Sequence, residues 1–479
     1  MNRLKKLGAA FRSWSAIVAL LLAVGMASVP RVSGQEGVGT RDASAATPAT
    51  APEAVLGARQ DAFNSGDLEA TLALFADDAV LISGTRRMTF QGKEEIRRQV
   101  QDQIARDQRE FAYDRHVEGD HVVQTVRISR NDWRRLGIDS LEAVQEVILR
   151  DGLIAFLDTR ITPASLAALE LAQAAPGILW VTNRSTNNIT ALRAGTGEVI
   201  ASVAVGSTPI GITAPQGTRK VYVSDEGSNQ VSVISKDTMA VVATIPTGPL
   251  PHHIAASPDG SYVYVAEYGA NKVSAIDTTT DTLVAEFTTG APETRTHAVW
   301  VSSDGSTVFA TNQVTNEIVA LDALDGTVRW TVGVGRTPSE ILVRPEGDIA
   351  FVSIRDEDKV QVVDLRARTI LEEFAVGAMP DTLMLTPDGS LLLIGLRGTP
   401  AQLAVVELSG ADAVSWVDFE GTTTGHNVLS PDGGYSFVAI EGDFPAVAVV
   451  DNLERTVTAT YYLGAGRPHG VYYDPEPLR

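Results

Sequence analysis

The sequence of 479 residues contains no cysteine and only seven histidines. Without cysteine the chain forms no disulfide, carries no lipid-modified cysteine and offers no thiolate for catalysis or metal binding. Basic residues are also outnumbered, because 39 Lys and Arg against 59 Asp and Glu give a net charge of −20. This charge opposes general binding to phosphate backbones or anionic lipid surfaces. We therefore expect no nucleic-acid partner.

Long apolar runs are absent except near the N-terminus. There a basic start containing Arg3, Lys5 and Lys6 precedes an apolar run from Ala16 to Ala27 and then small residues. The run is short for a spanning helix, so it predicts a signal peptide at residues 1–34, with an uncleaved anchor as the competing interpretation. Residues 35–53 are rich in Ala, Thr, Gly and Pro, which is typical of a flexible linker. We expect a periplasmic or secreted protein with no membrane segment after cleavage.

Residues 54–162 have the pattern of a small α+β domain. Two short helical patterns are separated by Ser65-Gly66-Asp67, and "DDAVLIS", an amphipathic helix and several strands follow. "AFNSGDLEATLALFADDAVLIS" together with "VILRDGLIAFLDTRITPASLAAL" resembles the SnoaL-like branch of the nuclear-transport-factor-2-like (NTF2-like) superfamily. The resemblance implies a cone-shaped α+β fold whose members are isomerases, hydrolases, ligand carriers or dimerisation modules. Thr162-Pro163 then predicts a connecting helix over residues 163–176.

Several polar residues of this domain are candidates for the cone interior. These candidates are Tyr113, His121, Arg127 and Trp133, and an acid such as Asp114 would serve as the catalytic base beside them. The alternative is that these side chains lie on solvated strand faces, and we favour it. The domain is therefore expected to bind or dimerise rather than to catalyse.

From residue 177 to 475 the sequence repeats. A marker strand recurs about every 42–45 residues, beginning at Trp180, Tyr222, Tyr264, Phe309, Phe351, Leu393 and Phe437. Four short strands per unit predict a propeller blade, because one such sheet cannot bury both faces without neighbours. Seven units predict an all-β seven-bladed propeller, and "RPHGVYYD" at the end should pair with the first marker strand to close the ring.

"SPDGSYVYVAEYGANKVSAIDTTT" resembles the YVTN-repeat family of seven-bladed propellers, which is related to the lactonase-like propellers. The resemblance implies the fold for residues 177–475. Its members include sugar-lactone hydrolases, electron-transfer and copper enzymes, surface-layer proteins and binding scaffolds. The aspartates of the "SPDG"-type turns, such as Asp259, lack the acid spacing of a calcium loop and predict tight turns with Gly at positive φ.

Four of the seven histidines align at the start of the first strand of a blade. The alignment places at one position Ile210, His252, His297, Ser339, Asp381, His426 and His469. These side chains should surround the channel mouth, whereas the adjacent His253 should point away and pack. Imidazoles favour zinc, copper, nickel or iron over calcium, so His252, His297, His426 and His469 are the candidate metal ligands.

The turn after each marker strand should lie on the same face. It contributes Asp225 and Glu267 on an acidic side, and Arg355 and Arg397 on a basic side, beside Asp381. With one open position, a metal ion held here would activate a water molecule, with Glu267 as base and an arginine holding an anionic intermediate. Two alternatives stay open: the histidines recur only by duplication of an ancestral blade, or the site binds an anion without metal.

The sequence contains no Gly-rich phosphate loop, no Ser-His-Asp order and no metalloprotease helix motif. The leading hypothesis is an exported binding or interaction protein whose ligand or protein partner occupies the propeller mouth. The alternative is a metal-dependent hydrolase of the lactonase kind, with one zinc or copper ion. A third hypothesis is a scaffold that dimerises through the N-terminal domain.

Overall fold

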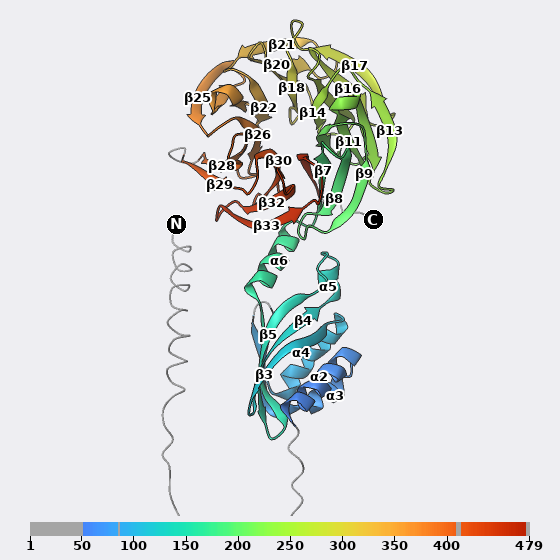
Figure 1. Ribbon diagram of the computed structural model, residues 1–479, viewed down its shortest axis with the longest axis vertical. Coiled ribbons are helices and arrows are strands. Elements are labelled where there is room, and N and C mark those ends of the chain that lie inside the picture. The colour runs from blue at the N-terminus through green and yellow to red at the C-terminus, as the bar shows by residue number, and fades with distance from the viewer. Residues whose placement is uncertain (1–50, 85–86, 409–412, 476–479) are drawn as a thin grey trace, which may run out of the picture. The chain divides into compact units, whose positions relative to one another are not determined.

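The computed structural model describes residues 51–84, 87–408 and 413–475. The predicted signal peptide and most of the predicted linker lie outside these ranges and stay predictions. Within the described ranges, no helix has both the length and the apolar character needed to cross a membrane. The described chain starts with helices and one mixed sheet and continues as seven four-stranded sheets (Figure 1).

The N-terminal domain follows the predicted order of helices and strands. Its elements are α2 (Pro52–Ser65), α3 (Leu68–Ala73), β1 (Phe75–Ser83), β2 (Met88–Gln91), α4 (Gly92–Ala105), β3 (Arg109–Glu118), β4 (His121–Ser129), α5 (Asn131–Arg134), β5 (Leu141–Arg150) and β6 (Leu153–Ile161). The expected break is present, because Gly66 ends α2 at φ 80° and the Asp67 carboxylate accepts a hydrogen bond from Ala70 N at 2.9 Å to begin α3.

The sheet of this domain has the strand order β2-β1-β6-β5-β4-β3. The β1–β6 pair is parallel and the other pairs are antiparallel, so the sheet is mixed rather than purely antiparallel. Helices α2, α3 and α4 share one buried apolar cluster with the sheet, to which Phe63, Leu72 and Ile96 contribute from the helices. The other face of the sheet carries exposed side chains, including Phe111 and Tyr113.

The candidate interior residues of this domain do not line its interior. Tyr113 is 53% exposed, and Asp114, His121 and Arg127 are also exposed, as the solvated-face alternative predicts. For His121 and Arg127 the exposure follows from strand alternation, whereas Tyr113 and Asp114 are both exposed because the register of β3 shifts between Ala112 and Asp114. Trp133 is buried, but in an apolar cluster with Val126 and Ile128 on the preceding strand.

Helix α6 (Pro163–Ala174) follows β6 as the sequence predicts. The Thr162 side chain accepts a hydrogen bond from Ser165 N at 3.3 Å, and Pro163 occupies the first turn. Leu171 and Ala175 at the end of this segment belong to the same buried cluster as Leu179 and Tyr473.

Each of the seven repeats forms one antiparallel sheet. The sheets are β34 (Pro468–Asp474), β7 (Ile178–Asn183), β8 (Asn188–Arg193), β9 (Val199–Ala204); β10 (Pro209–Thr213), β11 (Lys220–Asp225), β12 (Gln230–Ser235), β13 (Ala240–Pro246); β14 (Pro251–Ala256), β15 (Tyr262–Glu267), β16 (Lys272–Asp277), β17 (Thr282–Thr288); β18 (Thr296–Val301), β19 (Thr307–Asn312), β20 (Glu317–Asp322), β21 (Val328–Gly333); β22 (Pro338–Val343), β23 (Ile349–Ile354), β24 (Lys359–Asp364), β25 (Thr369–Ala375); β26 (Pro380–Leu385), β27 (Leu391–Leu396), β28 (Gln402–Glu407), β29 (Val414–Asp418); and β30 (Thr423–Leu429), β31 (Tyr435–Glu441), β32 (Ala446–Asp451), β33 (Thr456–Tyr462). Short 3₁₀ turns follow β11 (η2, Glu226–Ser228) and β23 (η3, Arg355–Glu357).

The first strands of the sheets form a closed ring around a channel. Each of β10, β14, β18, β22, β26, β30 and β34 contacts the next, and β34 contacts β10 again. The C-terminal β34 pairs with β7, with Tyr472 opposite Trp180, so the closure predicted from the sequence is present. Apolar residues of neighbouring sheets fill the spaces between them, which is why no sheet is stable alone.

The turns before the marker strands have the predicted structure. In the first of them Gly260 adopts φ 73°, and the Asp259 carboxylate accepts hydrogen bonds from Ser257 Oγ at 2.6 Å and Ser261 N at 3.0 Å. Asp304 accepts the same bonds in the next sheet. These carboxylates therefore close turns, in agreement with the interpretation made from their spacing.

Candidate functional site

Every first strand of the ring carries a β-bulge near its beginning. In β14, Pro251 pairs with Glu267 and the next pair is Ile254 with Val265, so His252 and His253 both lie opposite the single residue Ala266. The same register shift occurs in the other six first strands. A bulge interrupts the alternation of side chains along a strand. Two consecutive residues of one strand can therefore both reach the channel.

The bulges define two layers of residues in the channel. By strand register the outer layer comprises Ile210, His252, His297, Ser339, Asp381, Gly425 and His469, and the inner layer comprises Gly211, His253, Ala298, Glu340, Thr382, His426 and Gly470. The sequence alignment placed His426 with His252, but Asn427 pairs with Val438 as Ile254 pairs with Val265, so His426 is equivalent to His253.

His253 is part of the histidine cluster, and the expectation that it points away from the ring is wrong. Its ring stacks on His252 at 4.8 Å between centroids and lies 4.7 Å from His297. Its Nε2 lies 3.1 Å from Nε2 of His426, which belongs to a sheet several repeats away. The bulge is the physical reason, because strict alternation would have turned His253 into the blade.

Five imidazoles are therefore packed against one another. The His252 and His297 centroids are 4.4 Å apart, and those of His426 and His469 are 5.0 Å apart. His252, His253 and His297 each offer one ring nitrogen, and these atoms lie within 4.8 Å of one another. Of the predicted ligands, His252 and His297 belong to this group of three, whereas His426 and His469 lie next to it.

Hydrogen-bond partners orient two of these three rings. His297 Nδ1 lies 3.0 Å from the carbonyl oxygen of Ser339, so Nδ1 carries the hydrogen and Nε2 keeps its lone pair. His253 Nδ1 lies 3.1 Å from Glu340 Oε2, and this contact orients the His253 ring. The Nδ1 atom of His252 is buried and has no hydrogen-bond partner among the described residues.

The environment favours the neutral form of four rings, those of His252, His297, His426 and His469. Burial lowers the pKa of His252 well below its ordinary value, and the nearby His297 and His253 lower it further. The pKa values of His297 and His426 are lowered first by burial and then by His253. For His469 burial is again the main cause of the lowered pKa, followed by a neighbouring guanidinium. Neutral imidazoles keep a nitrogen lone pair for a ligand.

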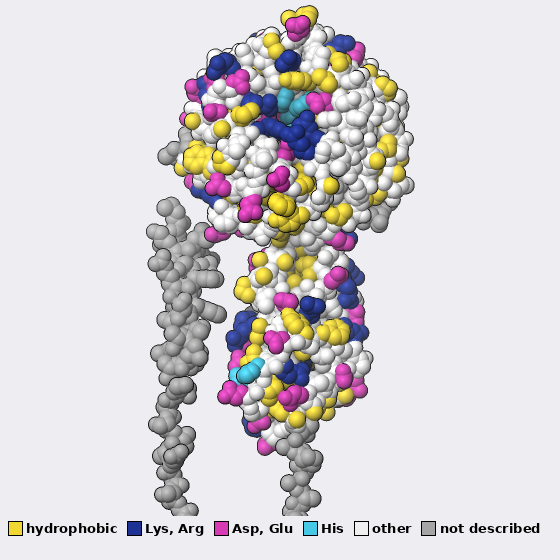
Figure 2. Space-filling view, viewed as in Figure 1, with side chains coloured by type: hydrophobic (Ala, Val, Ile, Leu, Met, Phe, Trp, Pro, Cys, Tyr) yellow, Lys and Arg dark blue, Asp and Glu magenta, His cyan; other side chains and the backbone are white. Residues whose placement is uncertain are grey.

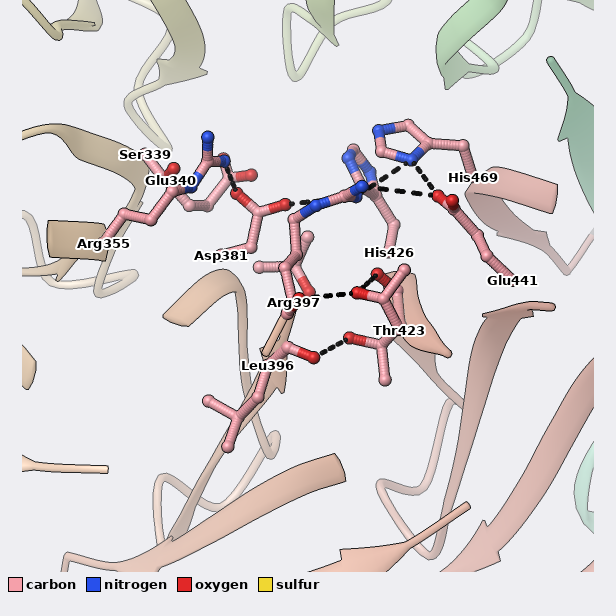
Figure 3. A network of polar contacts seen from close by, with 12 residues as sticks. Ser339, Glu340, Arg355, Asp381, Leu396, Arg397, Thr423, His426, Glu441 and His469 are labelled. Atoms are coloured by element: carbon pink, nitrogen blue, oxygen red, sulfur yellow. Dashed lines mark hydrogen bonds and ion pairs between the residues drawn. The ribbon is translucent and has the colours of Figure 1, made fainter. Parts of the chain in front are cut away.

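Charged side chains surround the outer layer and pair with one another (Figure 3). Asp381 is 2% exposed and forms ion pairs with Arg355 and Arg397. Burial alone would raise the pKa of Asp381, but the two guanidiniums hold it well below its usual range. Arg397 also lies 3.5 Å from Glu441, whose other oxygen is 2.6 Å from Arg467 Nε. Figure 2 shows basic side chains and histidine together at the centre of this face.

Glu441 also binds an outer-layer histidine, because its Oε1 lies 3.1 Å from His469 Nδ1. Arg397 Nη1 lies 3.2 Å from the same His469 nitrogen. His469 is thus held by two charged partners, unlike His252, and belongs to the ion-pair network rather than to the group of three.

On the other side of the histidines the channel opens into a cavity of about 390 Å³. All seven first strands contribute to its wall. His253, Glu340 and His426 of the inner layer line it, whereas His252, His297 and Asp381 of the outer layer do not. The histidines therefore separate a charged mouth from this second compartment.

Asp225 and Glu267 are not brought to the histidines. Asp225 Oδ2 accepts hydrogen bonds from Ser232 Oγ at 2.6 Å and Gln230 Nε2 at 3.2 Å on the next strand. Glu267 accepts hydrogen bonds from Gly248 N at 2.9 Å and from Ser274 Oγ. Both carboxylates join the end of a marker strand to its own sheet. Arg355, Arg397 and Asp381, in contrast, lie together as predicted for one face.

Glu340 and the inner-layer position of His253 were missed by the sequence analysis. The signal was present, since "PSEI" places Glu340 in the position that His253 occupies in "PHHI". That position faces the channel only because the strand contains a bulge, and an alignment of the repeats does not reveal the bulge.

Two segments match models of known protein families. Residues 58–157 match the SnoaL-like domain, and residues 251–369 match the seven-bladed β-propeller model described as Lactonase. The chain combines a SnoaL-like domain with a lactonase-type propeller. Both resemblances found in the sequence are thereby confirmed.

Solved structures show the same propeller fold. A Pseudomonas aeruginosa periplasmic gluconolactonase is 18% identical with a TM-score of 0.52, and the match covers 62% of this chain and 98% of that one. A putative 6-phosphogluconolactonase from Bacteroides fragilis is 16% identical with a TM-score of 0.52 and the same coverage. Kuenenia stuttgartiensis hydrazine synthase is 22% identical with a TM-score of 0.50 and covers 58% of this chain and 93% of that one. At these identities the likeness extends to the fold alone. A comparison with curated protein sequences found no match.

Proposed function

We propose that the propeller is a metal-dependent hydrolase of lactones, with the ion held by His252, His253 and His297. The observation that carries the proposal is the convergence of three imidazole nitrogens within 4.8 Å of one another. This version of the lactonase hypothesis keeps His252 and His297 of the four ligands expected from the sequence, omits His426 and His469, and adds His253.

The donor set fits a transition-metal ion on three grounds. Neutral imidazoles are the preferred ligands of zinc and copper. The buried Nδ1 of His252 lacks a hydrogen-bond partner within the described part of the chain, which is costly unless a ligand occupies it. The carbonyl of Ser339 and the carboxylate of Glu340 orient His297 and His253 as outer partners orient metal-binding histidines.

Bound at these residues, a zinc or copper ion would supply Lewis-acid polarisation of the substrate carbonyl. In the overall reaction the oxygen of water bonds to the carbonyl carbon and the ring C–O bond breaks. The ring oxygen leaves as a hydroxyl after taking one proton of the water, and the product is a hydroxy acid.

We assign the proton transfer to His426. Its ring is neutral, lines the cavity and contacts His253 at 3.1 Å, so it lies beside the reacting group. Glu340 would position His253 through its Nδ1 contact. Glu267, the base expected from the sequence, is engaged within its own blade and has no part in this scheme.

The outer mouth supports a second candidate function, the metal-free binding of a small carboxylate. Arg355 and Arg397 converge on one carboxylate already, that of Asp381, and so demonstrate the donor geometry (Figure 3). This candidate is the binding protein of the leading sequence hypothesis. We further propose that the protein is exported to the periplasm or beyond, supported by the N-terminal residue pattern and by the lactonase-type neighbour described as periplasmic.

Metal content of the purified, tag-free protein tests the main candidate. We expect near-stoichiometric zinc, copper, nickel or iron by elemental mass spectrometry, and its loss in His297→Ala. The matched control is His116→Ala, which removes an exposed histidine of the N-terminal domain and should keep the metal. Wild-type protein that contains no metal and takes up none when it is added would overturn the metal assignment and leave the carboxylate-binding candidate.

A partner proposal remains for the N-terminal domain. Its outer sheet face exposes Phe111, Tyr113, Val123 and Ile148. We propose that a second copy of the chain covers this face, as expected for a dimerisation module. Sedimentation of the mature protein and of Phe111→Glu tests it: a dimer that the substitution dissociates supports the proposal, and a monomeric wild-type protein overturns it.

A further inference from the structure

The cavity below the histidines differs in chemistry from the mouth above them. Its wall is built by residues that follow the bulges, among which Ile254 and Val428 are partly exposed aliphatic side chains, and its polar lining includes Thr213, Gln216 and Ser257. Trp300 and Met384 add further apolar surface. No Lys or Arg lines it, and Glu340, at its inner end, is its one acidic side chain. The compartment is large enough for a small organic group.

The apolar wall follows from the strand pattern. After the bulge, alternation resumes, and side chains such as Ile254, Met384 and Val428 keep part of their apolar surface toward the cavity. Of two polar wall residues, Thr382 donates a hydrogen bond to Asn427 Oδ1, whereas Asn427 Nδ2 has no partner among the described residues. The wall therefore favours an apolar occupant.

The mouth is a poor alternative site for a strongly anionic substrate. Arg355 and Arg397 already pair with Asp381, and Arg397 and Arg467 lie against Glu441. These buried carboxylates neutralise much of the positive charge that would attract a multiply charged anion such as a phosphate.

We infer that the substrate is a lactone bearing an apolar substituent, with its carbonyl at the inner histidine layer and its apolar substituent in the 390 Å³ cavity. The inference rests on the proposed hydrolase function and specifies its substrate class. A sugar lactone is disfavoured, because hydroxyl groups placed against Ile254 and Val428 would lose water without gaining hydrogen-bond partners from these side chains.

A series of γ-lactones with increasing alkyl substituents tests the inference on the metal-loaded wild-type protein. The probes are γ-butyrolactone, γ-hexalactone, γ-octalactone and γ-decalactone, with glucono-δ-lactone as the polar comparison. Hydrolysis is followed by acid release at constant pH. We expect kcat/KM to rise about fourfold per methylene until the cavity is full, and to be lowest for glucono-δ-lactone.

Filling the cavity should remove this dependence. Val428→Trp places a large ring in the wall and should lower the ratio of kcat/KM for γ-decalactone to kcat/KM for γ-butyrolactone at least tenfold. Ile254→Phe is a milder second substitution. The matched control is Val242→Trp on the outer strand β13, where the side chain is 54% exposed.

Calorimetric binding of the corresponding γ-lactams, which resist hydrolysis, separates the inference from the proposed function. Lactam binding should strengthen with the length of the alkyl substituent and be abolished by Val428→Trp. This result supports the cavity assignment, even if no lactone is hydrolysed and the hydrolase proposal fails. Lactone hydrolysis that is independent of tail length and fastest for glucono-δ-lactone overturns the inference and leaves the hydrolase proposal standing. If the protein neither binds the lactams nor hydrolyses the lactones, the inference and the hydrolase proposal are both overturned.

Discussion

The interior of the N-terminal domain and the propeller channel both bury a group of polar side chains, but they satisfy them differently. In the domain, the Glu110 carboxylate accepts hydrogen bonds from Arg59 at 2.9 Å, Gln108 at 3.1 Å and Gln145 at 2.9 Å. In the channel, imidazole rings pack against one another, and His252 Nδ1 has no hydrogen-bond partner within the described residues.

The difference is the one expected between a structural network and the binding site proposed above. A buried polar group costs free energy unless it is paired, so mutually paired groups hold a fold together. Unpaired groups persist where function requires them, and a ligand then supplies the missing interaction. Both Glu110 oxygens are paired, although Arg59 Nε has no partner among the described residues, and we propose that the histidine cluster belongs to the second class.

The largest expected effect comes from breaking the paired network. Arg59→Met leaves the buried Glu110 carboxylate without its cation and should cost about 3–5 kcal/mol of folding free energy. Hydrogen exchange of β3 and β4 amides measures the loss. The exposed control Arg127→Met, which removes a guanidinium stacked on Tyr113, should change stability by less than about 1 kcal/mol. Equal protection in Arg59→Met and wild type would mean that the pair is not structural.

Asp225 is intermediate between the two classes, because Oδ2 is hydrogen-bonded and Oδ1 has no partner in the described residues. Burial raises its pKa to about 6, above the 3.8 of an unperturbed aspartate. The folded state therefore binds the Asp225 proton more tightly than the unfolded state. The ionised carboxylate destabilises the folded state, and this effect is fully present above pH 6 and absent below pH 3.8.

Asp225→Asn should consequently stabilise the propeller at pH 7 by roughly 1–3 kcal/mol and make no difference at pH 3.5. Asn183 and Asn312 already occupy the equivalent position in two other blades, so the amide fits. Urea unfolding at both pH values checks the sign. Asp381→Asn is the opposite control, since it removes the partner of two arginines and should destabilise at pH 7. Lower stability of Asp225→Asn at pH 7 would contradict the assignment.

Glu340→Ala should weaken metal binding by roughly 10–100-fold, because it removes the carboxylate that orients His253. Competition with a chromogenic chelator measures the affinity. The control is Glu226→Ala, which breaks the Arg184 ion pair and should leave the affinity unchanged. An unchanged affinity in Glu340→Ala would show that His253 is oriented by its other contacts.

The smallest expected effect is on the stability of His252→Leu. Since this ring contributes an unpaired buried nitrogen, its removal from metal-free protein should alter stability by less than about 1 kcal/mol, although metal binding is lost. Gln145→Leu provides the contrast, because this buried side chain bonds Gln124, Glu110 and Thr159 and its loss should cost about 1–3 kcal/mol. Thermal unfolding of both variants compares the two regions directly, and a large loss in His252→Leu would make the cluster structural.

Much of the fold was predictable because it depends on local patterns. Helix caps such as Asp67 and Thr162 and the turn at Asp259-Gly260 have short-range signatures, and the closing strand ending at Asp474 follows from the count of repeats. The parallel pairing of β1 with β6 was not predicted, because it depends on long-range packing rather than on either strand's own sequence.

The site was only partly predictable. His252, His297, Asp381, Arg355 and Arg397 were placed on one face by counting repeat positions, and they do lie near one another. Counting could not show the consequence of a bulge, so the positions of His253 and His426 were assigned wrongly and Glu340 was overlooked.

The sequence by itself determined the repeat, the number of sheets and the strand that closes the ring, because the alternating apolar residues and turn glycines recur in each unit. Only the tertiary structure decided which polar residues meet. Ring closure brings strands from distant repeats to one axis, and the bulge rotates two successive side chains toward it. That is why His426 meets His253 across the channel, whereas Glu267, three residues after Tyr264 in a regular strand, remains within its own blade.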